Sequence, residues 1–270
     1  MVRHLGRHRV LWLLTAALAL VAAGVGVVNP SIYEGVVSAA IMPGVLSQDL
    51  LALALAILVV ALSLHAGAAD VIQQVVILGA MGAFFYVYGI YTIEQVYDAL
   101  YLVYMAIFGL AFYTLVHDLA DLREDVLRRV TLAAPLRTAS AVWALITALI
   151  FYPLWIGQLV PLMQAGDRIE YTFSIYILDL CFIMPAFVIL AVRVLRRDGL
   201  GLLAMPALFI VGFAVLAPLA LAEALKPLIY GRTMDPGAFW MFLVLSVVYL
   251  VLTVVHLRKL QVGADVVSAG

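Results

Sequence analysis

The sequence has few charged residues and almost no cysteine. Only 11% of its 270 residues are charged, whereas soluble domains carry about 25%. So few charges cannot cover a surface that faces water, which excludes an ordinary soluble globular protein. The net charge of -1 gives no basic surface, so no nucleic-acid partner is expected. The single cysteine, Cys181, excludes an internal disulfide and a multi-cysteine metal site, and its apolar neighbours predict a buried side chain.

The motifs of common enzyme and cofactor sites are missing as well. The sequence contains no Gly-x-Gly-x-x-Gly, no phosphate-binding loop, no Gly-x-Ser-x-Gly and no zinc-ligand spacing. No lysine lies inside a predicted helix, where a retinal Schiff base would need one. We therefore expect no cofactor, and we favour a binding or transport role over catalysis. No motif points to a known family.

Long apolar runs dominate the chain. Apolar residues make up 67% of it and the mean hydropathy is +1.17. A helix needs about 20 apolar residues to cross the hydrocarbon core of a bilayer. This pattern predicts an all-α, polytopic transmembrane bundle of about eight helices that forms a single domain. The predicted helices are Val10–Val28, Leu50–Ala66, Ile72–Tyr91, Val96–Val116, Ala139–Val160, Tyr171–Leu195, Leu200–Leu225 and Ala238–Leu257.

Lysine and arginine are distributed unevenly between the two sets of connecting segments. With eight helices, one set holds 12 of the 15 basic residues and the other holds Arg168, Lys226 and Arg232. Basic residues collect on the cytoplasmic side of membrane proteins. The pattern therefore predicts that both termini are cytoplasmic, in a plasma or inner membrane.

The start of the chain could be a cleaved signal peptide or a retained helix. Three arginines precede the run Val10–Val28, which is longer than the 7–15 apolar residues typical of a signal peptide. Its many small residues also suit close helix packing in lipid. We expect a retained first helix.

A faint internal repeat divides the chain into residues 1–130 and 131–270. Three residues of the first part recur in the second at offsets of about 130. Parallel repeats of this kind occur in transporters, although similar positions in equivalent loops would give the same matches. The pairs are Pro30 and Pro161, Asp49 and Asp179, and Glu94 and Glu223.

Acidic residues inside or beside the predicted helices are the first candidates for a site, because ionisable groups are costly in lipid. Asp179 is the deepest, about 12 Å along its helix at 1.5 Å per residue. Asp49 and Asp98 are expected in the first turns of their helices, where a carboxylate caps free N–H groups. Glu223 lies near a helix end, with Lys226 one turn away as its expected ion-pair partner.

Tyrosines near these acids are the second group of candidates. Tyr97, Tyr101 and Tyr104 follow helical spacing beside Asp98 and are expected to form one stripe, and Tyr176 precedes Asp179. Such a stripe lines a cavity for a flat or cationic ligand, or belongs to an interfacial aromatic belt. The candidate ligand-binding residues are therefore Asp179, Glu223, Asp98, Asp49, Tyr97, Tyr101, Tyr104 and Tyr176.

Other features give weaker signals. His65, His117 and His256 end three predicted helices on the cytoplasmic side without metal-ligand spacing, and His4 and His8 are expected to meet lipid headgroups. Residues 117–137 predict an amphipathic helix on the membrane surface, with Leu119, Leu122, Val126 and Leu127 towards the lipid. Four prolines, at 153, 185, 206 and 218, are expected to kink helices, and Pro185 would free a carbonyl near residue 181.

These features are compatible with three functions. The leading hypothesis is a membrane protein that binds or transports a small molecule, a proton or a cation through an outward-facing acidic and aromatic cavity. The first alternative is a non-catalytic partner in a membrane-protein assembly. The second is an intramembrane enzyme for lipids or quinones, with Asp179 and either Glu223 or Asp49 as an acid–base pair.

Overall fold

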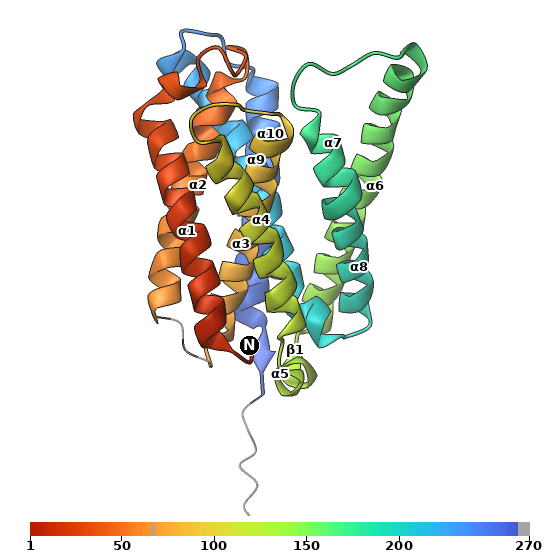
Figure 1. Cartoon of the computed structure of the whole chain (residues 1–270). Coiled ribbons are helices and arrows are strands. Elements are labelled where there is room, and N and C mark those ends of the chain that lie inside the picture. Colours follow the sequence, from red (N-terminus) through yellow and green to blue (C-terminus); the bar gives the residue numbers. More distant parts are fainter. Residues whose placement is uncertain (66, 68, 264–270) are drawn as a thin grey trace, which may run out of the picture.

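The computed structural model describes residues 1–65, 67 and 69–263, and within them eight helical segments are long and apolar enough to cross a membrane (Figure 1). The prediction of an all-α bundle is confirmed, and the chain is an integral multi-pass membrane protein. The segments are α1 (Leu5–Val28), α2 (Met42–His65), α3 (Val71–Ile93), α4 (Tyr101–Ala120), α6 (Ala134–Ala165), α7 (Ser174–Leu178) with α8 (Met184–Leu195), α9 (Gly199–Ile229) and α10 (Pro236–Lys259).

Short elements connect these helices. A 3₁₀ turn (Pro30–Tyr33) follows α1, and the short helix α5 (Glu124–Arg129) follows α4. Strands β1 (Val130–Thr131) and β2 (Gln261–Val262) pair antiparallel. The helices run up and down, so the connections gather at two ends (Figure 1). We call residues 1–4, 121–133, 196–198 and 260–263 the basic end, and residues 29–41, 94–100, 166–173 and 230–235 the acidic end.

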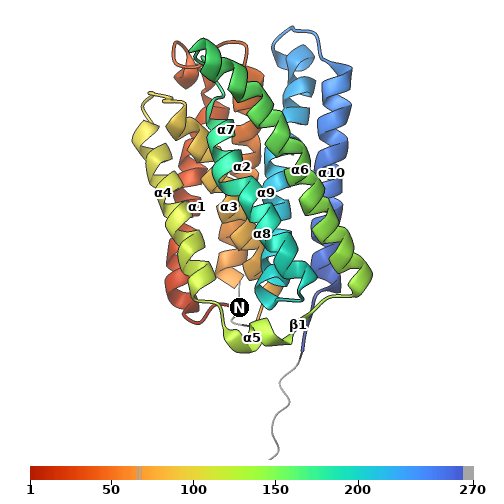
Figure 2. The ribbon, with the colours of Figure 1, turned by 90° about the vertical axis from the view of Figure 1, so that its right-hand side faces the viewer.

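Helices α3 and α9 form the centre of the bundle (Figures 1 and 2). Their apolar windows are 78% and 67% buried, against 39% or less for each of the other six spans. Glycine allows the two helices to approach closely: a Cβ at Gly79 would lie 2.6 Å from Ile210 Cδ1 and 3.0 Å from the Ala207 carbonyl oxygen. Helix packing in lipid depends on such small residues because no hydrophobic driving force brings the helices together.

Several predicted helix boundaries miss by four or more residues, and two of these errors affect candidate residues. Helix α2 begins at Met42 instead of Leu50, and α4 begins at Tyr101 instead of Val96. The predicted start of the second helix followed Gln48 and Asp49, because a polar side chain in lipid is costly. Ser47 and Asp49 are nevertheless buried inside the protein, so their burial in the bundle permits the longer helix. Ala66, the predicted end of this helix, lies outside the described residues.

The predicted surface helix at residues 117–137 is also wrong. Helix α4 continues to Ala120, and only Glu124–Arg129 form a separate helix. Leu122 is buried and pairs with Val2 in a β-bridge, and the backbone oxygen of Leu127 is packed against Gly199. Leu122, Val126 and Leu127 therefore pack against the basic end of the bundle and do not face lipid as predicted, while Leu119, near the end of α4, is exposed.

The prolines disturb one helix more than the others. Residues Asp179–Ile183 form a π-helical segment between α7 and α8, just before Pro185. This agrees with the predicted loss of regular hydrogen bonding near residue 181. Helices α6 and α9 continue through their prolines. Cys181 is exposed and not buried as predicted, because an apolar neighbourhood in the sequence marks a lipid-facing surface as well as a core.

Candidate functional site

Asp49 is a buried carboxylate in the interior of a helix. It is the eighth residue of α2 and only 1% exposed, so the predicted role as a first-turn cap is wrong. The first turn is occupied by Met42 and Pro43, and proline is favoured there because its missing N–H would have no partner. The helix therefore starts two turns before the carboxylate.

Two tyrosine hydroxyls donate hydrogen bonds to Asp49. Tyr33 Oη lies 2.7 Å from Asp49 Oδ2, and Tyr91 Oη lies 2.9 Å from Oδ1. Gly26 of α1 faces the same carboxylate, and a Cβ at that position would lie 2.0 Å from Oδ2. The small-residue surface of α1 thus leaves the space in which Asp49 sits.

A cluster of four tyrosines surrounds this carboxylate. The rings of Tyr33, Tyr88, Tyr91 and Tyr104 contact one another with centroid separations of 5.1 to 6.2 Å. All four side chains are buried. The rings therefore fill the space around Asp49 and close it to large molecules. We call these four residues with Asp49 and Asp98 the tyrosine cluster.

Asp98 connects the tyrosine cluster to the acidic end. It precedes α4, where its Oδ1 accepts from the Leu100 N–H at 2.7 Å and its Oδ2 accepts from Tyr104 Oη at 2.8 Å. Tyr104 and Tyr33 are buried neighbours, and each hydroxyl donates its single hydrogen to a carboxylate, Tyr104 to Asp98 and Tyr33 to Asp49. Asp98 is only partly buried, so a row of polar groups leads from the surface through Tyr104 and Tyr33 to Asp49.

The predicted stripe of Tyr97, Tyr101 and Tyr104 is wrong. Because α4 starts at Tyr101, Tyr97 lies in the preceding turn and is 63% exposed. Its ring packs edge-on against Tyr101, whose hydroxyl donates to the Thr92 carbonyl at 3.0 Å. Of these three tyrosines, only Tyr104 belongs to the tyrosine cluster. The other tyrosines of the cluster come from other segments of the chain.

Asp179 forms a separate buried site at the start of the π-helical segment. Trp155 Nε1 of α6 donates to Asp179 Oδ2 at 2.8 Å, and the buried Tyr86 of α3 is a neighbour of the same carboxylate. The hydroxyl of Tyr176 is directed elsewhere, to Gln158 Oε1 at 2.7 Å. The hydroxyl of the candidate residue Tyr176 therefore does not contact Asp179.

The two glutamates near the acidic end hold backbone segments. Glu223 accepts from Lys226 Nζ at 2.5 Å, which agrees with the predicted ion pair, and from the Asp235 N–H at 3.0 Å. Glu94 accepts from the N–H groups of Thr172 and Ser174 at 2.9 and 2.7 Å, and so caps α7 from another part of the chain. Within the described part of the chain, Asp49, Asp179 and Glu223 share no hydrogen-bond partner.

A polar cluster at the basic end was not predicted. His8 is 4% exposed and was expected to meet lipid headgroups, but its Nδ1 lies 2.5 Å from Asp118 Oδ1 and its Nε2 lies 2.8 Å from Asp121 Oδ2. Trp12 Nε1 donates to Asp118 Oδ2 at 2.9 Å, and the His4 N–H donates to Asp121 at 2.9 Å. The sequence signal for this cluster was the i, i+3 spacing of Asp118 and Asp121 at the end of α4, which places both carboxylates on one side of the helix.

The three remaining histidines lie at the basic end without forming a shared site. His256 is buried between Ser140 Oγ and the Leu202 carbonyl, at 3.1 and 2.9 Å. His65 bonds the Ala61 carbonyl of its own helix, and His117 is exposed. Among the residues that the structure describes, no group of three or more histidine, cysteine or acidic side chains is arranged to hold a metal ion.

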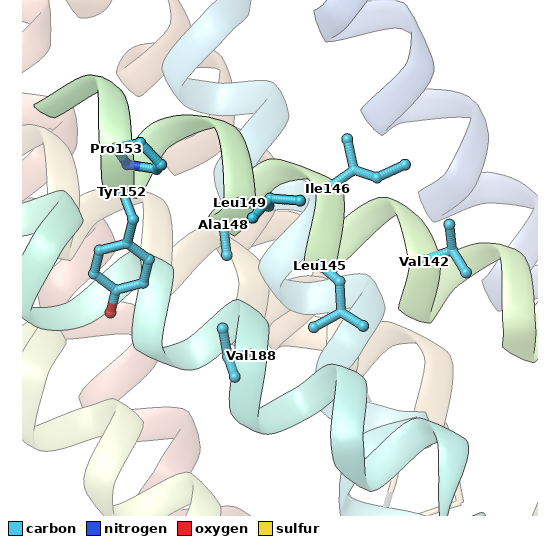
Figure 3. Close-up of a pocket in the computed structure, with 8 residues that line it drawn as sticks. All are labelled: Val142, Leu145, Ile146, Ala148, Leu149, Tyr152, Pro153 and Val188. Atoms are coloured by element: carbon cyan, nitrogen blue, oxygen red, sulfur yellow. The ribbon is translucent and has the colours of Figure 1, made fainter.

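An apolar groove lies between α6 and α8 (Figure 3). Tyr152 and Pro153 are at one end, and Val188 contributes from α8. None of the candidate carboxylates lines it. Because its side chains are almost all apolar, the groove suits a lipid chain and offers no chemistry of its own. The other lining residues are Val142, Leu145, Ile146, Ala148 and Leu149.

A function for this chain has to be inferred from the geometry of these clusters, because comparison with known proteins gives none. No protein family, no curated protein and no solved structure matches the chain.

Proposed function

We propose that the protein is a proton-coupled membrane transporter that takes up and releases a proton at Asp49 through the acidic end. The observation that carries the proposal is the row of groups from partly exposed Asp98 through Tyr104 and Tyr33 to Asp49. Asp98 is hydrogen-bonded to Tyr104 and Asp49 to Tyr33, and a proton crosses between the two tyrosines when one hydroxyl turns towards the other.

The chemistry of the partners favours proton exchange at Asp49 over Glu223. A tyrosine hydroxyl both donates and accepts hydrogen bonds, whereas ammonium and N–H groups only donate. Asp49 can therefore gain a proton and remain hydrogen-bonded, with Tyr33 or Tyr91 turning to accept. Glu223 faces an ammonium and a backbone N–H, and neither of these groups can accept a hydrogen bond from a protonated carboxyl group.

The closed packing of the cluster favours a proton as the ion that reaches Asp49. The four rings are buried and in contact, so a small molecule would have to displace them. A proton needs only the hydrogen-bonded groups. The identity of a co-transported substrate would then depend on a conformation in which the helices around the cluster separate.

The location of the protein forms part of the proposal. With the basic end cytoplasmic, as the distribution of lysine and arginine predicts, Asp98 and the tyrosine cluster open to the outside of a plasma or inner membrane. Protons would enter from the outer side.

Infrared difference spectroscopy of the protein in liposomes tests the proton site. The wild type should show a carboxylic-acid C=O band that appears as the pH falls, and Asp49→Asn should lose this band. Glu223→Gln is the matched control, because its carboxylate is fixed by donors and should not contribute. If Asp49→Asn retains the band, Asp49 is not the proton site.

Proton flux through the same liposomes tests the transport step. A pH-sensitive dye inside the vesicles should report proton entry that Asp49→Asn abolishes and Tyr33→Phe slows, because Tyr33 lies on the row to Asp98. Tyr91→Phe removes an equivalent hydrogen bond outside that row and should leave entry nearly unchanged. Equal effects of the two tyrosine variants would favour a structural cluster and hence the assembly hypothesis.

A further inference from the structure

The polar cluster at the basic end has no part in the proton row described above. His8 of α1 lies between two carboxylates of α4, with one ring nitrogen on each. Both ring nitrogens of histidine donate only when the ring is protonated. The two contacts therefore place an imidazolium, or a proton shared with a carboxyl group, at the interface of α1 and α4.

The two aspartates give this histidine an inner and an outer neighbour. Asp118 is fully buried and is held in place by the N–H of Trp12, while Asp121 is partly exposed in the turn after α4. His4 also contacts Asp121 from the N-terminal segment. A proton could thus move between water at the basic end and buried Asp118 by way of Asp121 and His8.

A buried hydroxyl continues this arrangement towards the centre of the bundle. Thr114 lies one turn from Asp118 on α4, about 6 Å along the axis. Its Oγ1 is buried and has no hydrogen-bond partner among the described residues. Buried polar atoms without a partner are rare and costly. The Thr114 hydroxyl is therefore placed to form a hydrogen bond with a water molecule or with a protonated Asp118.

One face of α4 joins the two polar clusters. Its buried residues are Tyr104, Ile107, Ala111, Thr114 and Asp118. Tyr104 belongs to the tyrosine cluster and Asp118 to the basic-end cluster, about 21 Å apart along the helix. Only apolar side chains lie between Tyr104 and Thr114 on this face, so an apolar segment separates the two clusters.

We propose that His8, Asp118 and Asp121 form a second proton-binding site, which exchanges a proton with the cytoplasmic side through the basic end. The proposal rests on the proposed function, since it supplies the inner counterpart of the Asp49 site. In the proton step, the bond between His8 Nδ1 and its hydrogen breaks and an O–H bond forms on Asp118. The products are a neutral imidazole and a neutral carboxylic acid, so the total charge is unchanged.

The surroundings of His8 define which groups act on this step. Asp118 and Asp121 face it from α4, and Trp12 is a neighbour on its own helix. His4 acts on Asp121 from the N-terminal segment, and His117 acts on Asp118. A histidine between two carboxylates keeps its proton more strongly than a free one, so release requires that a carboxyl group accepts it.

Nuclear magnetic resonance of ¹⁵N-histidine-labelled protein in sealed liposomes tests the proposal. The ring nitrogens of His8, assigned by comparison with His8→Asn, should change from the charged to the neutral form when pH is raised on the basic-end side. A change of pH on the acidic-end side alone should have no effect. If His8→Asn does not fold, Asp118→Asn supplies the assignment, because it alters the same signals.

Asp118→Asn and Trp12→Phe form a matched pair of variants. Each removes a hydrogen bond between α1 and α4, but only the first removes the proton acceptor. We expect Asp118→Asn to change the pH response of His8 and to stop proton flux, while Trp12→Phe retains both. A His8 ring that stays charged at every pH on either side would overturn the proposal, as would equal loss in the two variants.

The same samples separate this proposal from the function proposed for Asp49. The carboxylic-acid band of Asp49 should remain in Asp118→Asn, because the clusters are far apart. In the wild type, a His8 ring that does not respond to pH on the basic-end side, together with an intact Asp49 band, would leave the outer site in place and refute the inner one. A missing Asp49 band in the wild type would instead refute the proposed function.

Discussion

At the scale of single residues, the hydrogen-bond partners distinguish acids that the sequence presents as equals. Asp49 has tyrosine hydroxyls, Glu223 has an ammonium group, and Asp121 has histidine. Hydroxyls satisfy both protonation states, whereas cations favour ionisation. The capacity for proton exchange therefore follows from the neighbours and not from the depth of the acid in the helix.

Acid should weaken the contact between the N-terminal segment and α4. Although burial opposes it, hydrogen bonds from the His8 ring and from the backbone and ring of His4 hold the pKa of Asp121 well below its usual range. A depressed folded-state pKa gives stability that is complete above the unfolded pKa of about 3.9 and is lost as pH falls below it. The midpoint of thermal unfolding should therefore drop with acidification less steeply in Asp121→Asn than in the wild type.

Asp125→Asn is the control for this experiment. Hydrogen bonds from Arg123 lower the pKa of Asp125 as well, but this pair is exposed to water and stabilises little. Its unfolding midpoint should follow the wild type at each pH. The same acid dependence in Asp121→Asn and the wild type would show that Asp121 does not hold the segment.

At the scale of elements, α1 connects the two polar clusters through its small residues. Its buried face carries His8 and Trp12 near the basic end and Gly26 beside Asp49 near the acidic end. Between them the buried residues are mainly alanines, which bring the backbone close to its neighbours. Tyr88 Oη reaches the Ala19 carbonyl at 3.2 Å as a result.

Gly26→Ala should disrupt the tyrosine cluster. The added Cβ would lie 2.0 Å from Asp49 Oδ2 and 2.5 Å from Tyr33 Oη, so these side chains or the helix must shift. We expect a loss of about 1–3 kcal/mol in stability, measured by thermal unfolding in detergent, together with loss of the Asp49 infrared band. Gly24→Ala, where nothing lies within 4 Å of the new Cβ, should lose neither. Similar behaviour of the two variants would contradict the close contact.

At the scale of the whole molecule, the helices of the two halves pack in the same pattern. In the first half α1 packs on α2, α2 on α3 and α3 on α4, and in the second α6 packs on α8, α8 on α9 and α9 on α10. Across the halves α2 contacts α9 and α7 contacts α3. We propose that the chain is a duplicated four-helix unit, with Asp49 and Asp179 on equivalent helices.

The sidedness of the bundle can be measured with two introduced cysteines. In a Cys181→Ser background, a cysteine at Asp167 should react with a membrane-impermeant thiol reagent on intact cells. A cysteine at Asp125 should react only after permeabilisation. Both positions are accessible in the structure, so the membrane alone decides the result. The reverse pattern would place the basic end outside, against the distribution of lysine and arginine.

Much of the fold was predictable, and the candidate site was predictable only in part. The eight spans follow from apolar length, and the pairing of Glu223 with Lys226 follows from helical spacing. The tyrosine stripe failed because it depended on a helix start that was five residues too early. Tyr33, Tyr91 and Trp155 were missed because each reaches its acid from another helix or loop.

The sequence by itself determined that the chain crosses the membrane, how many times, and which residues are candidates for chemistry, because apolar runs and costly charges can be recognised locally. Only the tertiary structure decided which acids have proton-accepting partners. It placed His8 between Asp118 and Asp121, more than 100 residues away, and Asp49 among tyrosines from three other segments. Such contacts depend on how helices pack, which local patterns do not specify.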